Sequence, residues 1–177
     1  MKKALLIASV LFVAVISTAC INNIAVQELN NKAAEFMQKG DYESAVNRLQ
    51  ASIDLDSSVY ETYYNLGIAA TNAKKYEVAI DAFENGIKLN SDYTNFFYSL
   101  AVAQSEYAEA LLDSDDDKKT ISEEDKFKAQ NLKNSAVENA KKYLELTPNA
   151  EDKEDVEELI EDLTKVEKEE QPTLLKG

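Results

Sequence analysis

The sequence of 177 residues contains no histidine, one cysteine, four glycines and two prolines. Without histidine and with a single thiol, the chain cannot build Ser/His/Asp or Cys/His nucleophile systems, histidine-ligated metals, multi-cysteine zinc sites or intrachain disulfides. Average usage is roughly 7% glycine and 5% proline, so tight turns must be scarce here and long helices common. The composition argues against an all-β sandwich or barrel.

Basic residues are also scarce relative to acidic ones. The 19 Lys and Arg residues are outnumbered by 33 Asp and Glu residues, which gives a formal net charge of −14. A chain this acidic repels phosphate backbones, so we expect no nucleic-acid partner. Hydrophobic residues make up 45% of the chain, which is enough for a core, and the length fits one small domain.

The N-terminus has the three parts of an export signal. Lys2 and Lys3 precede an apolar run from Ala4 to Ile16, and small residues follow. The run is shorter than the roughly 20 residues that a membrane-spanning helix needs. We therefore interpret residues 1–19 as a signal peptide; an uncleaved membrane anchor is the alternative.

The only cysteine, Cys20, directly follows Ala19. Small residues leading into a cysteine resemble the lipobox of bacterial lipoproteins. The resemblance implies a diacylglyceryl group on the Cys20 thiol, cleavage before Cys20, and acylation, with palmitate for example, of the new amino group. Residues 20–25 would then be the lipidated cysteine and a short tether. The alternative is ordinary signal-peptidase cleavage after Ala19, which would leave a soluble secreted protein with one free thiol.

Lipidation of Cys20 would determine where the protein is located. We expect no cofactor, and the covalent lipid on Cys20 would be the only attached group. The protein would be exported and lipid-anchored to a bacterial membrane, the outer membrane in a Gram-negative host and the cell surface otherwise. Several acyl chains give stable anchoring where one chain is marginal, because each buried CH₂ contributes about 0.8 kcal/mol.

The rest of the chain repeats with a period of 34 residues. Seven pairs of similar residues share this offset: Ala33 and Gly67, Tyr42 and Tyr76, Ala45 and Ala79, Leu49 and Phe83, Ile53 and Ile87, Leu55 and Leu89, and Ser57 and Ser91. A fixed period of this length is typical of solenoid proteins built from stacked repeats.

The second copy carries the most specific motif. It reads Tyr63-x-x-Leu66-Gly67-x-x-Ala70 and then Ala79-x-x-x-Phe83. This pattern resembles the tetratricopeptide repeat, TPR, in which small residues stand where the two helices of a hairpin cross. The resemblance implies an all-α fold, a helical-hairpin solenoid of about three repeats plus a C-terminal capping helix.

The repeat register predicts the organisation of residues 26–166 as a TPR domain. The repeats are expected at about 26–59, 60–93 and 94–148, with an insertion near 108–130 that lengthens both helices of the third hairpin. Apolar residues from Val156 to Val166 recur at helical spacing among acidic ones, which predicts a capping helix over 151–166 with a solvated acidic face. Residues 167–177 are expected to be a disordered tail.

The insertion contains a weak calcium motif. Asp113, Asp115 and Asp117, with Glu124 at the twelfth position, partly match the EF-hand loop, but Lys118 stands where that loop needs glycine. A solvated acidic loop is the simpler interpretation, and no other metal cluster, phosphate loop or nucleophile elbow is present. We therefore expect a protein that is not an enzyme.

The resemblance also indicates a binding surface. In TPR proteins the first helix of each hairpin lines the concave face, and Tyr64 and Tyr98 hold equivalent positions there. Tyrosines are effective peptide anchors; the alternative is that they pack against the neighbouring hairpin. Carried over position by position, this face comprises Asn30, Ala34, Met37, Tyr64, Ile68, Thr71, Tyr98, Val102 and Ser105.

Two functions remain open on these grounds. The first is a non-catalytic, lipid-anchored adaptor or scaffold of the cell envelope that binds a peptide segment of another envelope protein. The second is a small-ligand or calcium-binding lipoprotein that uses the acidic loop 113–124. Because the predicted face carries no lysine or arginine, an acidic peptide is not the expected ligand.

Overall fold

The computed structural model describes residues 23–113 and 121–169 of the chain. Within these ranges the chain is helical apart from short connections, and no strand occurs among the described residues. The predicted signal peptide, Cys20, the centre of the acidic loop and the last eight residues lie outside the described ranges.

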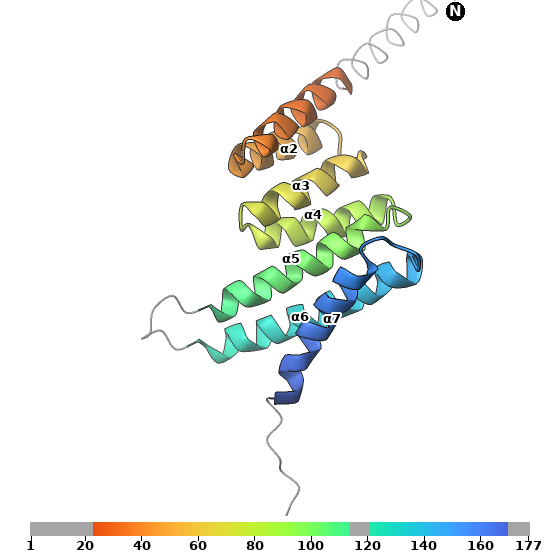
Figure 1. Cartoon of the computed structure of the whole chain (residues 1–177). Coiled ribbons are helices and arrows are strands. Elements are labelled where there is room, and N and C mark those ends of the chain that lie inside the picture. Colours follow the sequence, from red (N-terminus) through yellow and green to blue (C-terminus); the bar gives the residue numbers. More distant parts are fainter. Residues whose placement is uncertain (1–22, 114–120, 170–177) are drawn as a thin grey trace, which may run out of the picture.

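The described helices pair into hairpins that stack one on the next (Figure 1). The helical segment 23–38 pairs with α2, α3 with α4, and α5 with α6, and α7 packs on the last pair. This arrangement confirms the predicted all-α helical-hairpin solenoid. The bounds of the helices are Tyr42–Leu55 for α2, Tyr60–Asn72 for α3, Tyr76–Leu89 for α4, Asn95–Leu112 for α5, Glu123–Leu146 for α6 and Lys153–Glu169 for α7.

The first two hairpins turn with the same backbone geometry. Gly40 and Lys74, which are 34 positions apart, both have positive φ, +74° and +57°. In each turn the next backbone N–H donates to a carbonyl five residues back, Asp41 to Phe36 and Lys75 to Ala70. This is the pattern that satisfies the last carbonyls of a helix and usually places glycine in the left-handed conformation. Lys74 adopts that conformation at a steric cost.

Small residues let the helices cross closely. A Cβ atom at Gly67 would overlap the ring of Phe83, and one at Gly86 would overlap the ring of Phe96. Both phenylalanines are fully buried. Two clusters of buried side chains result, one from segment 23–38 to α5 and one among α5, α6 and α7.

The third hairpin is longer than the others. α5 has 18 residues and α6 has 24, against 13 and 14 in α3 and α4. The extension is fastened to the second hairpin by Lys128, whose Nζ donates to Glu77 Oε1 at 2.8 Å and to the Tyr107 hydroxyl at 2.6 Å. The Tyr107 hydroxyl donates in turn to Glu77 Oε1 at 2.7 Å. Three helices, α4, α5 and α6, therefore meet at one polar contact.

The capping helix α7 differs slightly from its predicted bounds. It begins at Lys153 rather than at 151, and it continues to Glu169, three residues past the predicted end at 166. Acidic residues in its first turn, Glu154 and Asp155, suit the positive end of the helix dipole. The buried side chains of Val156 and Leu163 attach this helix to the second core cluster.

Candidate functional site

The first helices of the hairpins contribute one surface, which we call the first-helix face. Neighbouring helices of this face touch directly, since the Ser99 hydroxyl of α5 donates to the Tyr64 hydroxyl of α3 at 3.4 Å. Its side chains are uncharged and at least partly exposed. They are Ala34 and Met37 of segment 23–38, Tyr64, Ile68 and Thr71 of α3, and Tyr98 and Val102 of α5.

Tyr64 stands at the centre of an aromatic cluster. Its ring centroid lies 5.1 Å from that of Tyr93, 5.5 Å from that of Phe96 and 6.1 Å from that of Phe83. The pairs with Tyr93 and Phe96 are edge-to-face, the arrangement that aromatic quadrupoles favour. Tyr64 therefore packs against the next hairpin while keeping part of its ring exposed.

Tyr98 has a different set of neighbours. Its ring stacks on that of Tyr143 from α6, with centroids 5.5 Å apart and planes 26° apart. Burial raises the pKa of the Tyr98 hydroxyl, and the negative charges of Asp152 and Asp155 raise it further. The two tyrosines hold equivalent repeat positions, but only Tyr98 lies beside the carboxylates of the capping segment.

Two residues of the predicted face are engaged inside the protein. Ser105 is only 5% exposed. The Asn30 amide donates to the Ser52 hydroxyl at 2.8 Å and to the Thr62 hydroxyl at 3.2 Å, both buried side chains. Asn30 joins its helix to α2 and α3 and Ser105 is buried, so we leave both out of the first-helix face.

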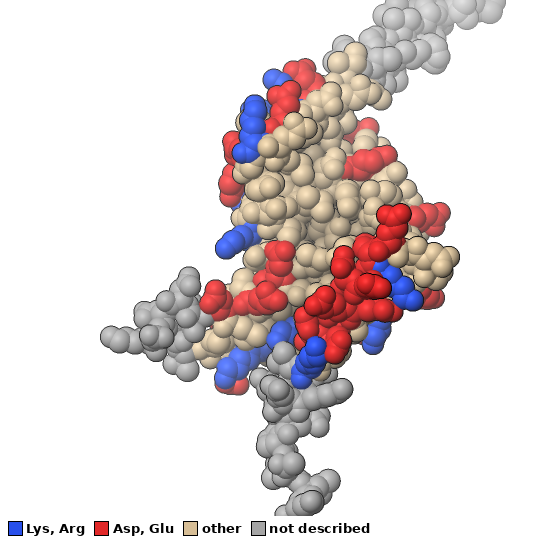
Figure 2. Space-filling view, viewed as in Figure 1, with Lys and Arg blue, Asp and Glu red and all other residues tan. Residues whose placement is uncertain are grey.

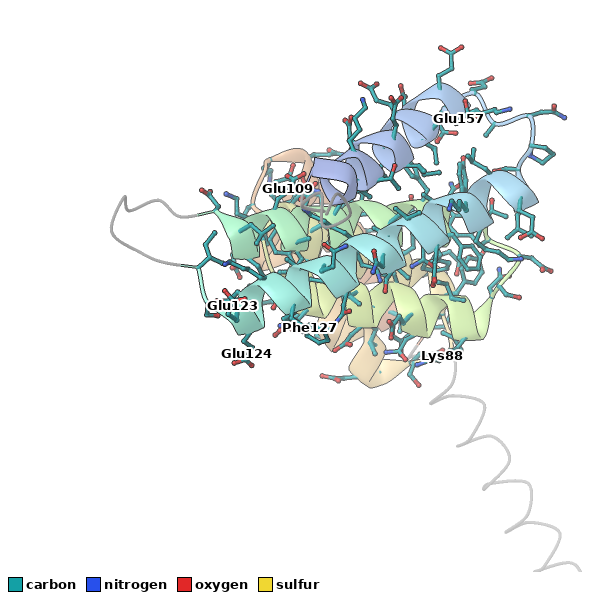
Figure 3. All side chains as sticks on the ribbon, turned by 90° about the horizontal axis from the view of Figure 1, so that it is seen from below. Lys88, Glu109, Glu123, Glu124, Phe127 and Glu157 are labelled. Atoms are coloured by element: carbon teal, nitrogen blue, oxygen red, sulfur yellow. The ribbon has the colours of Figure 1, made fainter. Side chains whose placement is uncertain are left out.

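An acidic surface on α7 borders one end of the first-helix face. Figure 2 shows the Asp and Glu side chains gathered over α7, below an uncharged area over α3 and α4. In Figure 3, Glu109 of α5 and Glu157 of α7 lie on the same side of the molecule, whereas Phe127 and Lys88 lie on the opposite side.

A separate open cavity of about 600 Å³, with mostly acidic charged residues, lies between α4 and α5. Burial is the main cause that raises the pKa of Glu106, and the negative charge of Glu109 raises it further. The positive charge of Lys74 partly offsets this increase. Sequence analysis did not identify this cavity. The signal was present, because spacings of three and four residues place Glu106, Glu109 and Asp113 on one side of α5. The cavity is lined by Lys74, Tyr76, Glu106, Glu109, Ala110 and Asp113.

The calcium hypothesis concerns residues that are only partly described. Asp113 and Glu124 are exposed at the ends of α5 and α6, while Asp115 and Asp117 lie outside the described residues. Among the residues that the structure describes, no three acidic, histidine or cysteine side chains are grouped so as to hold a metal ion. None of the described helices is long and apolar enough to cross a membrane.

Comparison with known proteins agrees with this architecture. A family model described as "TPR repeat" matches residues 33–70. No curated protein matches the chain. Fold and family match together support a TPR protein, and no enzyme family is indicated.

Among solved structures, the first TPR domain of Spaghetti (RPAP3), bound to the HSP90 peptide SRMEEVD, has a TM-score of 0.61 and 18% identity, with 81% of this chain and 93% of that chain covered. The second TPR domain of human RPAP3, in complex with the HSP70 peptide SGPTIEEVD, has a TM-score of 0.62 and 16% identity, with 81% and 98% covered. The Yersinia enterocolitica type III secretion chaperone SycD, in complex with a peptide of the translocator YopD, has a TM-score of 0.60 and 17% identity, with 80% and 93% covered. At these identities the likeness shows the fold.

Proposed function

We propose that this protein is a non-catalytic adaptor or scaffold that binds a peptide segment of another protein on its first-helix face. The observation that carries the proposal is the run of uncharged, partly exposed side chains across three successive first helices, with Ile68 and Val102 at equivalent positions of α3 and α5. Three solved neighbours of the same fold hold peptides. Fold alone does not name a partner, so the site must carry the argument.

The proposal includes a location. With Cys20 lipidated, the protein is tethered to a bacterial membrane, and its partner is an envelope protein or a segment exposed close to that membrane. The support is the sequence pattern of residues 1–20, a charged start, a short apolar run and small residues before the single cysteine.

The two RPAP3 neighbours bind peptides ending in EEVD, which are acidic. The first-helix face of this chain offers no lysine or arginine among its side chains. We therefore propose a partner segment of a different chemical class from those two peptides.

Crosslinking in the native host, followed by affinity purification and mass spectrometry, tests the adaptor role. The double variant Ile68→Ser/Val102→Ser removes two apolar contacts from the first-helix face. The matched control, Leu89→Ser/Phe127→Ser, removes two exposed apolar side chains elsewhere, 46% and 70% exposed, and Phe127 lies on the opposite side of the molecule (Figure 3). We expect a co-purifying envelope protein that the first variant loses by about tenfold or more and the control retains, since anchor residues dominate peptide binding. Equal recovery with both variants would contradict the proposed binding surface.

A further inference from the structure

We propose that the segment bound on the first-helix face is basic: its cationic side chains face Asp155 and Glu158 of α7, and its apolar side chains rest on Tyr98, Val102 and Ile68. This inference rests on the proposed function and adds the chemistry of the partner. It is argued from the charges that α7 leaves unpaired and from their position beside the face.

Some carboxylates of α7 are already neutralised within the helix. Lys153 Nζ lies 3.7 Å from Glu157 Oε1. Lys165 Nζ lies 3.0 Å from Glu161 Oε1 and 3.4 Å from Asp162 Oδ1. These pairs are exposed and contribute little to stability, yet they engage both lysines of this helix whose side chains the structure describes.

Other carboxylates of the same helix have no basic partner among the residues that the structure describes. Glu154, Asp155 and Glu158 are exposed, and none of them forms an ion pair with a described residue. They fall within five consecutive positions, so their charges repel one another in the free protein. A cation placed among them would relieve that repulsion as well as form its own charge pairs.

The packing of α7 joins these charges to the first-helix face. Tyr98 and Leu159 pack on one cluster of buried side chains that includes Val156, and Val156 and Leu159 are the chain neighbours of Asp155 and Glu158. In keeping with this, the charge of Asp155 raises the pKa of the Tyr98 hydroxyl, after burial and Asp152. Asp152 accepts a hydrogen bond from the Tyr143 hydroxyl at 2.8 Å, and Tyr143 stacks on Tyr98. The ring of Tyr98 therefore separates an uncharged surface on α3 and α5 from an acidic one on α7.

The surface is thus apolar in one part and anionic in the next. Electrostatic complementarity governs which partners dock and how quickly they do so. An acidic segment would meet uncompensated repulsion at α7, and an uncharged segment would leave its carboxylates unpaired. A segment that alternates apolar and basic side chains satisfies both parts.

Fluorescence anisotropy with synthetic peptides tests this inference on the full chain in nonionic detergent. The probe is a labelled 12-residue peptide of four leucines, four serines and four lysines, and the matched peptides carry four glutamines or four glutamates in place of the lysines. We expect the lysine peptide to bind at least about tenfold more tightly than the glutamine peptide at low salt, with the difference shrinking as salt rises, because screening weakens exposed charge pairs.

Two variants of equal net charge distinguish binding at a defined site from a general attraction of the lysine peptide to an acidic protein. Asp155→Asn/Glu158→Gln removes the charges beside Tyr98. Asp54→Asn/Glu84→Gln removes two exposed carboxylates from α2 and α4. We expect the first variant to weaken binding of the lysine peptide about three- to tenfold and the second to change it by less than about twofold, since the site contacts are local.

The outcomes separate the two proposals. Equal affinity for the lysine and glutamine peptides, or equal loss in both variants, would overturn the basic-segment inference and leave peptide binding in place. Tighter binding of the glutamate peptide would do the same. If none of the three peptides binds and the native host yields no partner on the first-helix face, the proposed function fails as well.

Discussion

At the scale of single residues, the two helical glycines show how tightly this solenoid is packed. Each glycine lies against the ring of a fully buried phenylalanine, Gly67 against Phe83 and Gly86 against Phe96. The motif in the second repeat predicts a small residue at Gly67, and the structure gives the reason: the ring occupies the space that a side chain would need. The 34-residue period alone does not show that Phe96, from the next hairpin, closes over Gly86 in the same way.

The substitution Gly67→Ala should lower the free energy of unfolding by about 1–3 kcal/mol, the usual cost of overpacking a core. Its cause can be checked with the Gly67→Ala/Phe83→Leu double variant measured by urea denaturation. Because the added methyl group and the Phe83 ring compete for one space, the double variant should lose less stability than the sum of the two single changes. Strictly additive losses would mean that the ring is not what restricts position 67.

At the scale of helices, the contact among Glu77, Tyr107 and Lys128 joins the long third hairpin to the second one. Lys128 Nζ also lies 4.6 Å from the centroid of the Tyr107 ring. The hydrogen bond that Lys128 donates is the main cause that lowers the pKa of Glu77, and the hydrogen bond from Tyr107 lowers it further. The same hydrogen bond to Glu77 raises the pKa of Lys128. A carboxylate whose pKa is lower in the folded state than in the unfolded state stabilises the fold at pH values above the unfolded-state pKa. That stabilisation is lost as the pH falls through the folded-state pKa.

The substitution Lys128→Gln should therefore loosen the first half of α6. We expect faster amide hydrogen exchange over residues 123–135 at pH 7, because local opening follows the loss of contacts that fasten a segment. The difference in protection from the unsubstituted protein should shrink below the ordinary pKa of Glu77, 4.5, as Glu77 becomes protonated in both proteins. Lys142→Gln is the control, because among the described residues Lys142 pairs only within α6, with Glu145 at 2.9 Å. Equal loosening by both variants would argue against the contact with α4 as the cause.

The sequence predicted the helices that belong to the 34-residue repeats. The hairpins and the all-α class could be predicted because the small and large residues of each crossing recur with one period. The environments of Tyr64 and Tyr98 could not, although the two share a repeat position. Tyr64 meets Tyr93, which lies in a connection between helices, and Tyr98 meets Tyr143, whose partner Asp152 precedes the capping helix. Connections and the inserted part of α6 lie outside the repeat pattern, so the pattern carries no information about them.

At the scale of the whole molecule, the lipid anchor is the prediction that decides where the protein acts. Replacement of the cysteine, Cys20→Ser, should move the protein from the membrane fraction to the soluble fraction, because the acyl chains supply the membrane affinity and an acidic chain gains none from anionic headgroups. Fractionation followed by immunoblotting measures this. A protein that stays in the membrane fraction after this substitution would contradict lipidation at Cys20.

The order of the stacked hairpins has a consequence for how such an anchored molecule stands on its membrane. The helical segment that starts at residue 23 comes three positions after Cys20, whereas α7 lies at the other end of the stack (Figure 1). If Cys20 is lipidated, three residues of chain reach at most about 10 Å even when fully extended, so the start of the first hairpin would lie close to the bilayer. The electric field of the headgroups decays within about 8–10 Å at physiological salt. The carboxylates of α7 lie at the opposite end of the stack (Figure 1), so in a molecule that stands upright on its anchor they would lie beyond that field and would attract cations from the surrounding compartment.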